Sequence, residues 1–409
     1  MSLSEILAIL ISISAVFSYI NFRFFRLPST IGLMLMALCL SIIVLLLDQF
    51  GFDLARYAEP IVHGFAFDDA LLHGMLGFLL FAGALHVNLN DLAQQKWVIL
   101  LLATVGVVLS TIIIGLVTWW LFAKMGFDIS FLYCLLLGSL ISPTDPIAVL
   151  GILKKVGVSK TLETKITGES LFNDGVGVVI FLVILGLITG GGELDISDAM
   201  ILFVIEAIGG ILFGLTIGAI AFYMLRSVNQ YQVEILTTLG LVMGGYALAE
   251  AIHVSAPIAI VVAGLMIGNH GRLLAMSDET RGHVDTFWEL IDEILNAVLF
   301  VMIGLEIMVI SLRTDYLLAG LLLIPIVLIT RFVAVGLPVS IMRYFREFSP
   351  RVITILTWGG LRGGISVALA LSLPAGQERD LILTVTYCVV IFSIMVQGLT
   401  IGRVINMNK

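Results

Sequence analysis

Stretches of about 20 consecutive apolar residues recur along this chain from its start to its C-terminal end, and they limit the possible folds more than any other feature. An α-helix of about 20 residues spans the ~30 Å hydrocarbon core of a bilayer. The 409 residues are 60% hydrophobic and only 12% charged, with a mean hydropathy of +1.13. An ordinary soluble domain carries about 25% charged residues. The chain is therefore predicted to be an all-α polytopic membrane protein.

We predict about thirteen transmembrane helices, numbered in chain order. Their ranges are 3–21, 28–47, 69–88, 97–122, 131–152, 164–189, 199–225, 232–252, 255–269, 287–310, 316–342, 351–373 and 381–402. The first range has no basic segment before it and no small-residue cleavage site, so it is interpreted as a span and not as a signal peptide.

The positive charges of the connections are distributed unevenly. Of the 21 Lys and Arg residues, fifteen lie in or beside the odd-numbered connections or at the C-terminus, four lie in the even-numbered connections, and two lie within spans. Short cytoplasmic loops carry an excess of Lys and Arg, so the odd-numbered connections are predicted to be cytoplasmic. The N-terminus is then outside and the C-terminus inside.

Two polar segments lie in the middle of predicted spans. The fifth span contains residues 142–146, SPTDP, and the sixth contains residues 168–175, GESLFNDG. A charge at the bilayer centre costs roughly 2.5–3.5 kcal/mol, so such residues usually belong to a substrate or proton path. Prolines on both sides of Thr144 and Asp145 also interrupt the helix, where unwound backbone can bind an ion. These segments indicate an ion-coupled membrane transporter.

The two central aspartates are expected to converge. Asp145 lies about 14 residues into the fifth span, ~21 Å deep, and Asp174 lies about 10 residues, ~15 Å, from the opposite face. Ser170 shares a helical face with Asp174, four residues away. The predicted ligands of a hard cation such as Na⁺ are therefore oxygen atoms of Asp174, Asp145, Ser170 and the broken backbone at Thr144.

Other charged residues of the spans need partners or a separate role. Glu169 is expected to pair with Arg362, which is flanked by glycines, although Glu169 could instead bind the ion directly. Arg331 either neutralises the empty site or tethers helices. Asn173 is expected to hydrogen-bond unwound backbone.

Simpler interpretations stay open for several acidic residues. Asp145 could only cap the half-helix that follows the proline break, and Asp174 could be a structural hydrogen-bonding residue. Asp292 and Glu293, at the start of the tenth span, form either an acidic cytoplasmic funnel or only a solvated helix start.

A weak internal repeat connects the two halves of the chain. Residues 80–87 in the third span are similar to residues 300–307 in the tenth, an offset of 220. The same offset carries Thr144 and Asp145 close to the Gly-rich segment 359–364 of the twelfth span. Spans seven apart cross in opposite directions, so this pattern predicts two inverted six-helix repeats with discontinuous, crossed helices 5 and 12.

At these residues the sequence resembles the monovalent cation:proton antiporters, in the branch of the NhaP-type and eukaryotic sodium/proton exchangers. The matching stretches are residues 144–149 (TDPIAV), 169–176 (ESLFNDGV) and 358–364 (WGGLRGG), on the expected helices and in the expected order. The resemblance covers essentially the whole chain.

The resemblance implies a homodimer whose subunits have a scaffold and a mobile core. The scaffold would comprise residues 1–95 (helices 1–3) and 232–310 (helices 8–10). The core would comprise residues 96–190 (helices 4–6) and 311–409 (helices 11–13), and residues 191–231 (helix 7) would link the halves.

The resemblance also implies roles for single residues. Asp174 would carry both the cation and the proton, assisted by Asp145, Ser170 and the Thr144 carbonyl. Asn173, where related branches have a second aspartate, implies electroneutral exchange. Some relatives have an acid in helix 3 where this chain has Ala82, so a carboxylate from the scaffold is not expected.

We therefore expect a Na⁺ (or Li⁺)/H⁺ antiporter of the cytoplasmic membrane that works by alternating access, with K⁺/H⁺ exchange as the alternative. An intramembrane aspartyl protease is disfavoured because its Gly-x-Gly-Asp segment is missing, and a channel does not need protonatable groups at mid-membrane. No cofactor is expected beyond the transported Na⁺ or Li⁺ and H⁺. The three cysteines are isolated in apolar runs, so a disulfide or metal framework is not expected. No basic patch with interleaved aromatic residues suggests nucleic acid as a partner.

Overall fold

The computed structural model describes residues 3–50, 70–189, 196–308, 310, 313–346, 348 and 351–406, and every regular element within those ranges is a helix. In chain order these elements are α1 (Leu3–Ile20), η1 (Asn21–Phe25), α2 (Ser29–Gln49), η2 (Ala70–Met75), α5 (Leu76–Leu85), α6 (Leu89–Leu101), η3 (Leu102–Gly106), α7 (Val107–Met125), α8 (Phe131–Ile141), α9 (Ile147–Val156), α10 (Lys160–Thr189), α11 (Ile196–Ser227), α12 (Tyr231–Ala251), α13 (Ala256–Met266), η4 (Ile267–Gly271), α14 (Arg272–Leu274), α15 (Asp278–Leu305), η5 (Glu306–Met308), α16 (Thr314–Met342), α17 (Val352–Trp358), α18 (Gly364–Leu371), α19 (Gln377–Phe392), η6 (Ser393–Gly398) and α20 (Leu399–Asn406).

Local signals in the sequence set several helix ends. The side chain of Asn88 accepts hydrogen bonds from two backbone N–H groups in the first turn of α6. Ser277 caps α15 in the same way, and Ser255 caps α13. Such caps satisfy N–H groups that the helix itself leaves without partners.

The predicted membrane location agrees with the helices observed. Within the described ranges, nine helices are long and apolar enough to cross a membrane. Each of the thirteen predicted spans coincides with one helix or with adjoining helix segments, although the number of crossings itself stays a prediction. Large apolar side chains on one stripe of α11 are about half exposed; they are Ile201, Ile205, Ile208, Leu212 and Leu215. A stripe of this kind suits contact with lipid tails, and the chain is a multi-pass membrane protein.

The prediction of discontinuous helices 5 and 12 is confirmed. Helix 5 consists of α8 and α9, separated by the non-helical residues 142–146. Helix 12 consists of α17 and α18, separated by residues 359–363. Pro143 and Pro146 cannot donate backbone hydrogen bonds and so interrupt the first helix, while three of the five residues in the second interruption are glycines.

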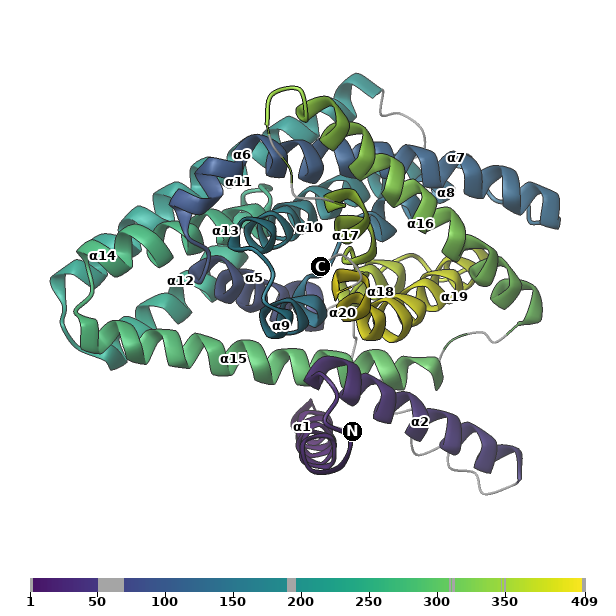
Figure 1. Cartoon of the computed structure of the whole chain (residues 1–409), viewed down its shortest axis with the longest axis horizontal. Helices are drawn as coiled ribbons and strands as arrows, with labels where there is room; N and C mark the ends of the chain where they lie inside the picture. Colours follow the sequence, from purple (N-terminus) through teal and green to yellow (C-terminus); the bar gives the residue numbers. More distant parts are fainter. Residues whose placement is uncertain are drawn as a thin grey trace.

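Two clusters of buried apolar residues hold the helices together. The larger cluster joins α1, α2, α7–α10, α16–α20 and the second half of α15. The smaller cluster joins α5, α11–α13 and the first half of α15, with a few residues of α6 and α10. Figure 1 shows α12 and α14 at the left of the view and α16 and α19 at the right, with α15 running below both. Both α10 and α15 therefore contribute to both clusters.

Candidate functional site

The two helix interruptions meet in the interior of the protein. The backbone N–H of Asp145, in the first interruption, donates a hydrogen bond of 2.8 Å to the carbonyl of Leu361, in the second. A helix interruption leaves backbone N–H and carbonyl groups without their usual hydrogen-bond partners. Here an N–H of one interruption and a carbonyl of the other are paired with each other. This contact joins segments more than 200 residues apart in the chain.

Glycine is required where the second interruption passes Asp145. A Cβ atom at Gly363 would lie 2.2 Å from Asp145 Oδ2 and 2.8 Å from its Cγ. The carboxylate of Asp145 therefore lies directly against the backbone of the second interruption. A similar close approach occurs on α10, where a Cβ at Gly177 would lie 2.2 Å from Pro143 Cγ. Thus α10 packs tightly on the first interruption and places its polar residues there.

Thr144 connects the first interruption to α10 by side-chain hydrogen bonds. Asn173 Nδ2 donates to Thr144 Oγ1 at 2.8 Å, and Asn173 Oδ1 accepts from the Thr144 N–H at 3.3 Å. The hydroxyl groups of Thr144 and Ser170 are 3.2 Å apart. All three side chains are buried. Asn173 therefore supports unwound backbone, while Ser170 lies beside the Thr144 side chain.

Asp174 lies one turn beyond Ser170 on α10 and is 8% exposed. It is close enough to Asp145 for the two carboxylates to interact electrostatically. No described residue donates a hydrogen bond to its carboxylate, in contrast to the general rule for buried polar groups. The structure thus gathers the oxygen-bearing side chains of Asp174, Asp145, Ser170 and Thr144 around the two interruptions. Hard monovalent cations favour oxygen ligands of these kinds.

The structure contradicts the predicted ion pair between Glu169 and Arg362. Glu169 Oε1 instead lies 2.5 Å from Arg331 Nη1, with both side chains buried. Arg362 Nη1 donates to the carbonyls of Ser142 and Pro143, at 2.8 Å each. These are carbonyls at the end of α8 that the interrupted helix leaves free, and a guanidinium is well suited to them. Arg331 therefore ties α16 to α10, and Arg362 ties the two interruptions together.

A polar chain that sequence reasoning missed anchors the second interruption. Ser393 Oγ accepts a hydrogen bond from the Arg362 N–H at 2.9 Å and donates to Gln397 Oε1 at 2.9 Å. Gln397 Nε2 in turn donates to the Trp358 carbonyl at 3.1 Å. Ser393 and Gln397 lie in η6, a π-helical segment of the kind that is frequent at functional sites. Two polar residues one turn apart within the apolar thirteenth span were the signal available in the sequence.

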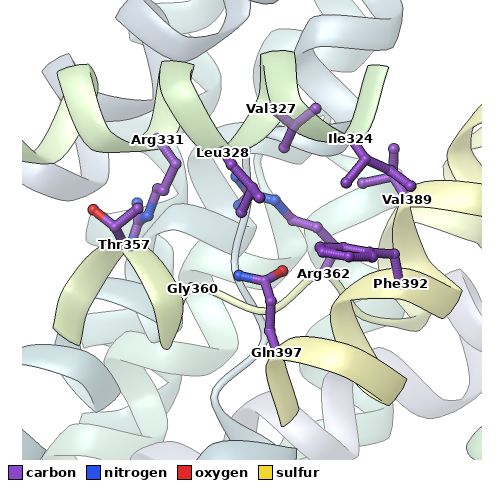
Figure 2. A pocket seen from close by; sticks show the side chains of 10 residues that line it. All are labelled: Ile324, Val327, Leu328, Arg331, Thr357, Gly360, Arg362, Val389, Phe392 and Gln397. Carbon is purple, nitrogen blue, oxygen red and sulfur yellow. The ribbon is translucent and has the colours of Figure 1, made fainter. Parts of the chain in front are cut away.

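A small cavity lies between these anchors, with a volume of about 10 Å³. Figure 2 shows Arg331, Thr357 and Gln397 among the residues that line it. Arg331 Nε and Thr357 Oγ1 are buried and have no hydrogen-bond partner among the described residues. The volume is about that of one water position, and the two polar atoms suit a water molecule.

The third helix has an apolar residue, alanine, at position 82. Ala82 in α5 is 1% exposed. The neighbouring Gly83 faces Leu171 of α10, whose Cδ1 is 3.9 Å from the position of a Cβ at Gly83. Position 82 therefore adds no charge where α5 packs beside the segment of α10 that bears the site.

The charges of five described residues at the interruptions, namely Glu169, Arg331, Arg362, Asp145 and Asp174, do not cancel. Glu169 and Arg331 form a buried ion pair. Arg362 interacts electrostatically with both members of that pair, and Asp145 and Asp174 are the other two carboxylates. Three carboxylates against two guanidinium groups leave one negative charge among these five described residues. One monovalent cation or one proton is enough to neutralise it.

Comparisons with known proteins identify the family of this chain. The model of the family described as sodium/hydrogen exchanger, transmembrane, matches residues 11–407. The chain is 52% identical over 406 residues to the Na⁺/H⁺ antiporter NhaP of Pseudomonas aeruginosa, covering 98% of this chain and 96% of the relative. It is 37% identical over 383 residues to the Na⁺/H⁺ antiporter NhaH of Halobacillus dabanensis, covering 92% and 91%.

A solved structure shares the fold. The sodium proton antiporter MjNhaP1 from Methanocaldococcus jannaschii, determined at pH 8, superimposes with a TM-score of 0.75 over 98% of both chains, at 21% identity. At that identity the similarity concerns the architecture alone. Together with the family model and the curated relatives, it shows that this chain belongs to the transmembrane sodium/hydrogen exchanger family, whose members are transporters and not enzymes.

Proposed function

We propose that the protein exchanges one Na⁺ or Li⁺ for one H⁺ across the cytoplasmic membrane, at a site formed by Asp174, Asp145, Ser170 and Thr144. The observation that carries this proposal is the carboxylate of Asp174, which is 8% exposed and receives no hydrogen bond from the described residues. A buried carboxylate without partners is expensive unless a proton or a cation neutralises it. Such a group suits a carrier that binds the two ions alternately.

The net charge of the site supports a one-for-one stoichiometry. With the Glu169–Arg331 pair and Arg362 in place, the site has a single uncompensated negative charge. Binding one cation or one proton gives a neutral site, and a neutral site crosses the low-dielectric region at far lower cost than a charged one. A Na⁺ and a proton would then compete for the same carboxylate, and exchange would be electroneutral.

Alternating access would require that a core move against a scaffold. We propose residues 96–190 and 311–409 as the core, residues 1–95 and 232–310 as the scaffold, and residues 191–231 as the link. The contacts between the interruptions, which join helices 5 and 12, support a core that moves as one body. The boundary at 190/191 lies outside the described residues. The larger apolar cluster also includes α1 and α2, so these two helices pack with the core in the state seen here.

The assembly and orientation are part of the same proposal. The protein would be a homodimer in the cytoplasmic membrane, with the N-terminus outside and the C-terminus in the cytoplasm. The excess of Lys and Arg in the odd-numbered connections supports this orientation. No cofactor is needed, because the transported Na⁺ (or Li⁺) and H⁺ are the ligands of the site.

The experiment is exchange in proteoliposomes, followed by dequenching of a pH-sensitive dye after Na⁺ or Li⁺ is added. Asp174→Asn and Asp145→Asn should each abolish the signal while the purified protein stays folded, because an amide cannot release a proton. Asp128→Asn, the same change at an exposed acid after α7, is the matched control and should exchange normally. Full exchange by the Asp174→Asn protein would remove the central assignment.

A further inference from the structure

A strip of polar residues on α15 leads toward the proposed ion site. Glu289, Asp292, Glu293 and Asn296 are spaced three, four and seven residues apart, so they lie on one side of the helix. Glu289 and Glu293 are exposed, Asp292 is half-buried and Asn296 is buried. The strip therefore begins with acidic groups in contact with the surroundings and ends with an amide in the interior, about 10 Å further along the helix.

Asn296 places a polar side chain in the interior of the protein. Its side chain is 4% exposed, and its Oδ1 accepts no hydrogen bond from the described residues. Asn296 lies within hydrogen-bonding reach of Asp292, one turn earlier, which gives its amide nitrogen an acceptor and leaves the oxygen available. An unsatisfied buried oxygen costs about 1–3 kcal/mol. An apolar side chain of similar size would avoid that cost, so the oxygen needs an explanation.

The inner end of the strip lies next to the helix interruptions. Leu299, three residues after Asn296, packs on Gly364, where a Cβ would lie 2.6 Å from Leu299 Cδ1. The preceding residue, Gly363, is the one that lies against the Asp145 carboxylate. Asp292 is also close enough to Asp145 to interact electrostatically. The strip and the ion site are therefore neighbours, although one lies on α15 and the other around α10 and the two interruptions.

We propose that the Asp292 carboxylate and Asn296 Oδ1 form a second oxygen site for a monovalent cation, outside the exchange site and on its path. The proposal rests on the proposed function, since it concerns how the cation reaches Asp145 and Asp174. Glu289 and Glu293 raise the local concentration of cations. Asp292 and Asn296 then replace part of the hydration shell before the cation passes to the exchange site.

The location of this second site on α15 has a mechanistic consequence. Because α15 belongs to the proposed scaffold, the second site would stay in place while the core carries Asp145 and Asp174 across. It would therefore affect how readily the exchange site fills, and hence the KM for Na⁺. The rate at saturating Na⁺ would depend on the core and would change much less.

The first test is the Na⁺ dependence of exchange in two variants at position 296. Asn296→Leu removes the oxygen and should raise the KM for Na⁺ about fivefold, the equivalent of one lost polar contact, with less than a twofold fall in the maximal rate. Asn296→Asp keeps an oxygen ligand and should not raise the KM. A purely structural role predicts instead that Asn296→Leu changes thermal stability and leaves KM unchanged, and that outcome would overturn the proposal.

The second test locates the cation when the exchange site is disabled. Crystals or cryo-EM samples of Asp174→Asn protein are soaked with Tl⁺ alone, a heavy monovalent cation. Tl⁺ density between Asp292 and Asn296 is expected, and it should disappear in the Asp174→Asn/Asn296→Leu double variant. Absence of Tl⁺ there in both proteins would refute the second site. Failure of the wild-type protein to exchange Na⁺ for H⁺ would instead refute the proposed function, so the two failures are distinguishable.

Discussion

Breaking the buried ion pair between Glu169 and Arg331 is expected to destabilise the protein by an amount that depends on which partner is removed. The two charged groups lie 2.5 Å apart, and the side chains of Arg331 and Glu169 are 5% and 2% exposed. Removing one member of such a pair costs roughly 3–5 kcal/mol, because the other charge stays buried without compensation. Each single substitution to Gln should therefore be strongly destabilising.

Arg362 makes the two substitutions unequal. Its guanidinium interacts electrostatically with both members of the pair. In Arg331→Gln, Arg362 still offsets the charge of Glu169, so the loss of unfolding free energy should be near the lower end of the range, about 3 kcal/mol. In Glu169→Gln, two guanidinium groups remain without that carboxylate, so the loss should be near about 5 kcal/mol.

The assay is reversible unfolding in mixed micelles of a mild detergent and SDS, followed by tryptophan fluorescence. The double variant Glu169→Gln/Arg331→Gln should lose less than the sum of the single losses, since it leaves neither charge unpaired. Arg313→Gln is the matched control, because the Arg313–Asp315 ion pair is exposed and should contribute nothing measurable. Equal losses in the two single variants, or a larger loss in Arg331→Gln, would refute this reasoning.

Two further predictions concern the ion site directly. Gly363→Ala would place a Cβ 2.2 Å from Asp145 Oδ2, so the exchange rate should fall at least about tenfold, as expected for a displaced binding group. Gly151→Ala in α9 is the control and should leave exchange unchanged, because a Cβ there would have nothing within 4 Å. Normal exchange by the Gly363→Ala protein would show that the position of Asp145 does not matter. If Na⁺ and H⁺ compete for Asp174 as proposed, the KM for Na⁺ should rise about tenfold for each unit of falling pH below the pKa of the site and level off at higher pH. A KM for Na⁺ that does not depend on pH would contradict this competition.

Much of the architecture was predictable because lipid imposes simple rules. Apolar runs of membrane-spanning length indicated the helices, and the prolines around Thr144 and Asp145 indicated the first interruption. The glycines at 359–364 indicated the second, since they allow close approach and irregular backbone. The structure confirms both interruptions and shows them hydrogen-bonded to one another.

The partner of Glu169 could not be predicted from the spacing of residues in the sequence. Arg331 and Arg362 are both basic residues within spans, and only the packing of α16 against the other helices decides which guanidinium reaches Glu169. Arg362 had a second set of acceptors, the carbonyls freed at the end of α8. The roles of Ser393 and Gln397 likewise depend on the π-helical segment η6, which nothing in the local sequence pattern specified.

The most direct test of the account is the number of protons released when Na⁺ binds to the purified protein in weakly buffered detergent solution. If one carboxylate carries both ions, Na⁺ binding should release up to one proton per protein, with the yield falling as the pH rises and the site is already deprotonated. Asp174→Asn protein should release none. Stoichiometric Na⁺ binding to the wild-type protein without any proton release, across the whole pH range of activity, would contradict the central claim.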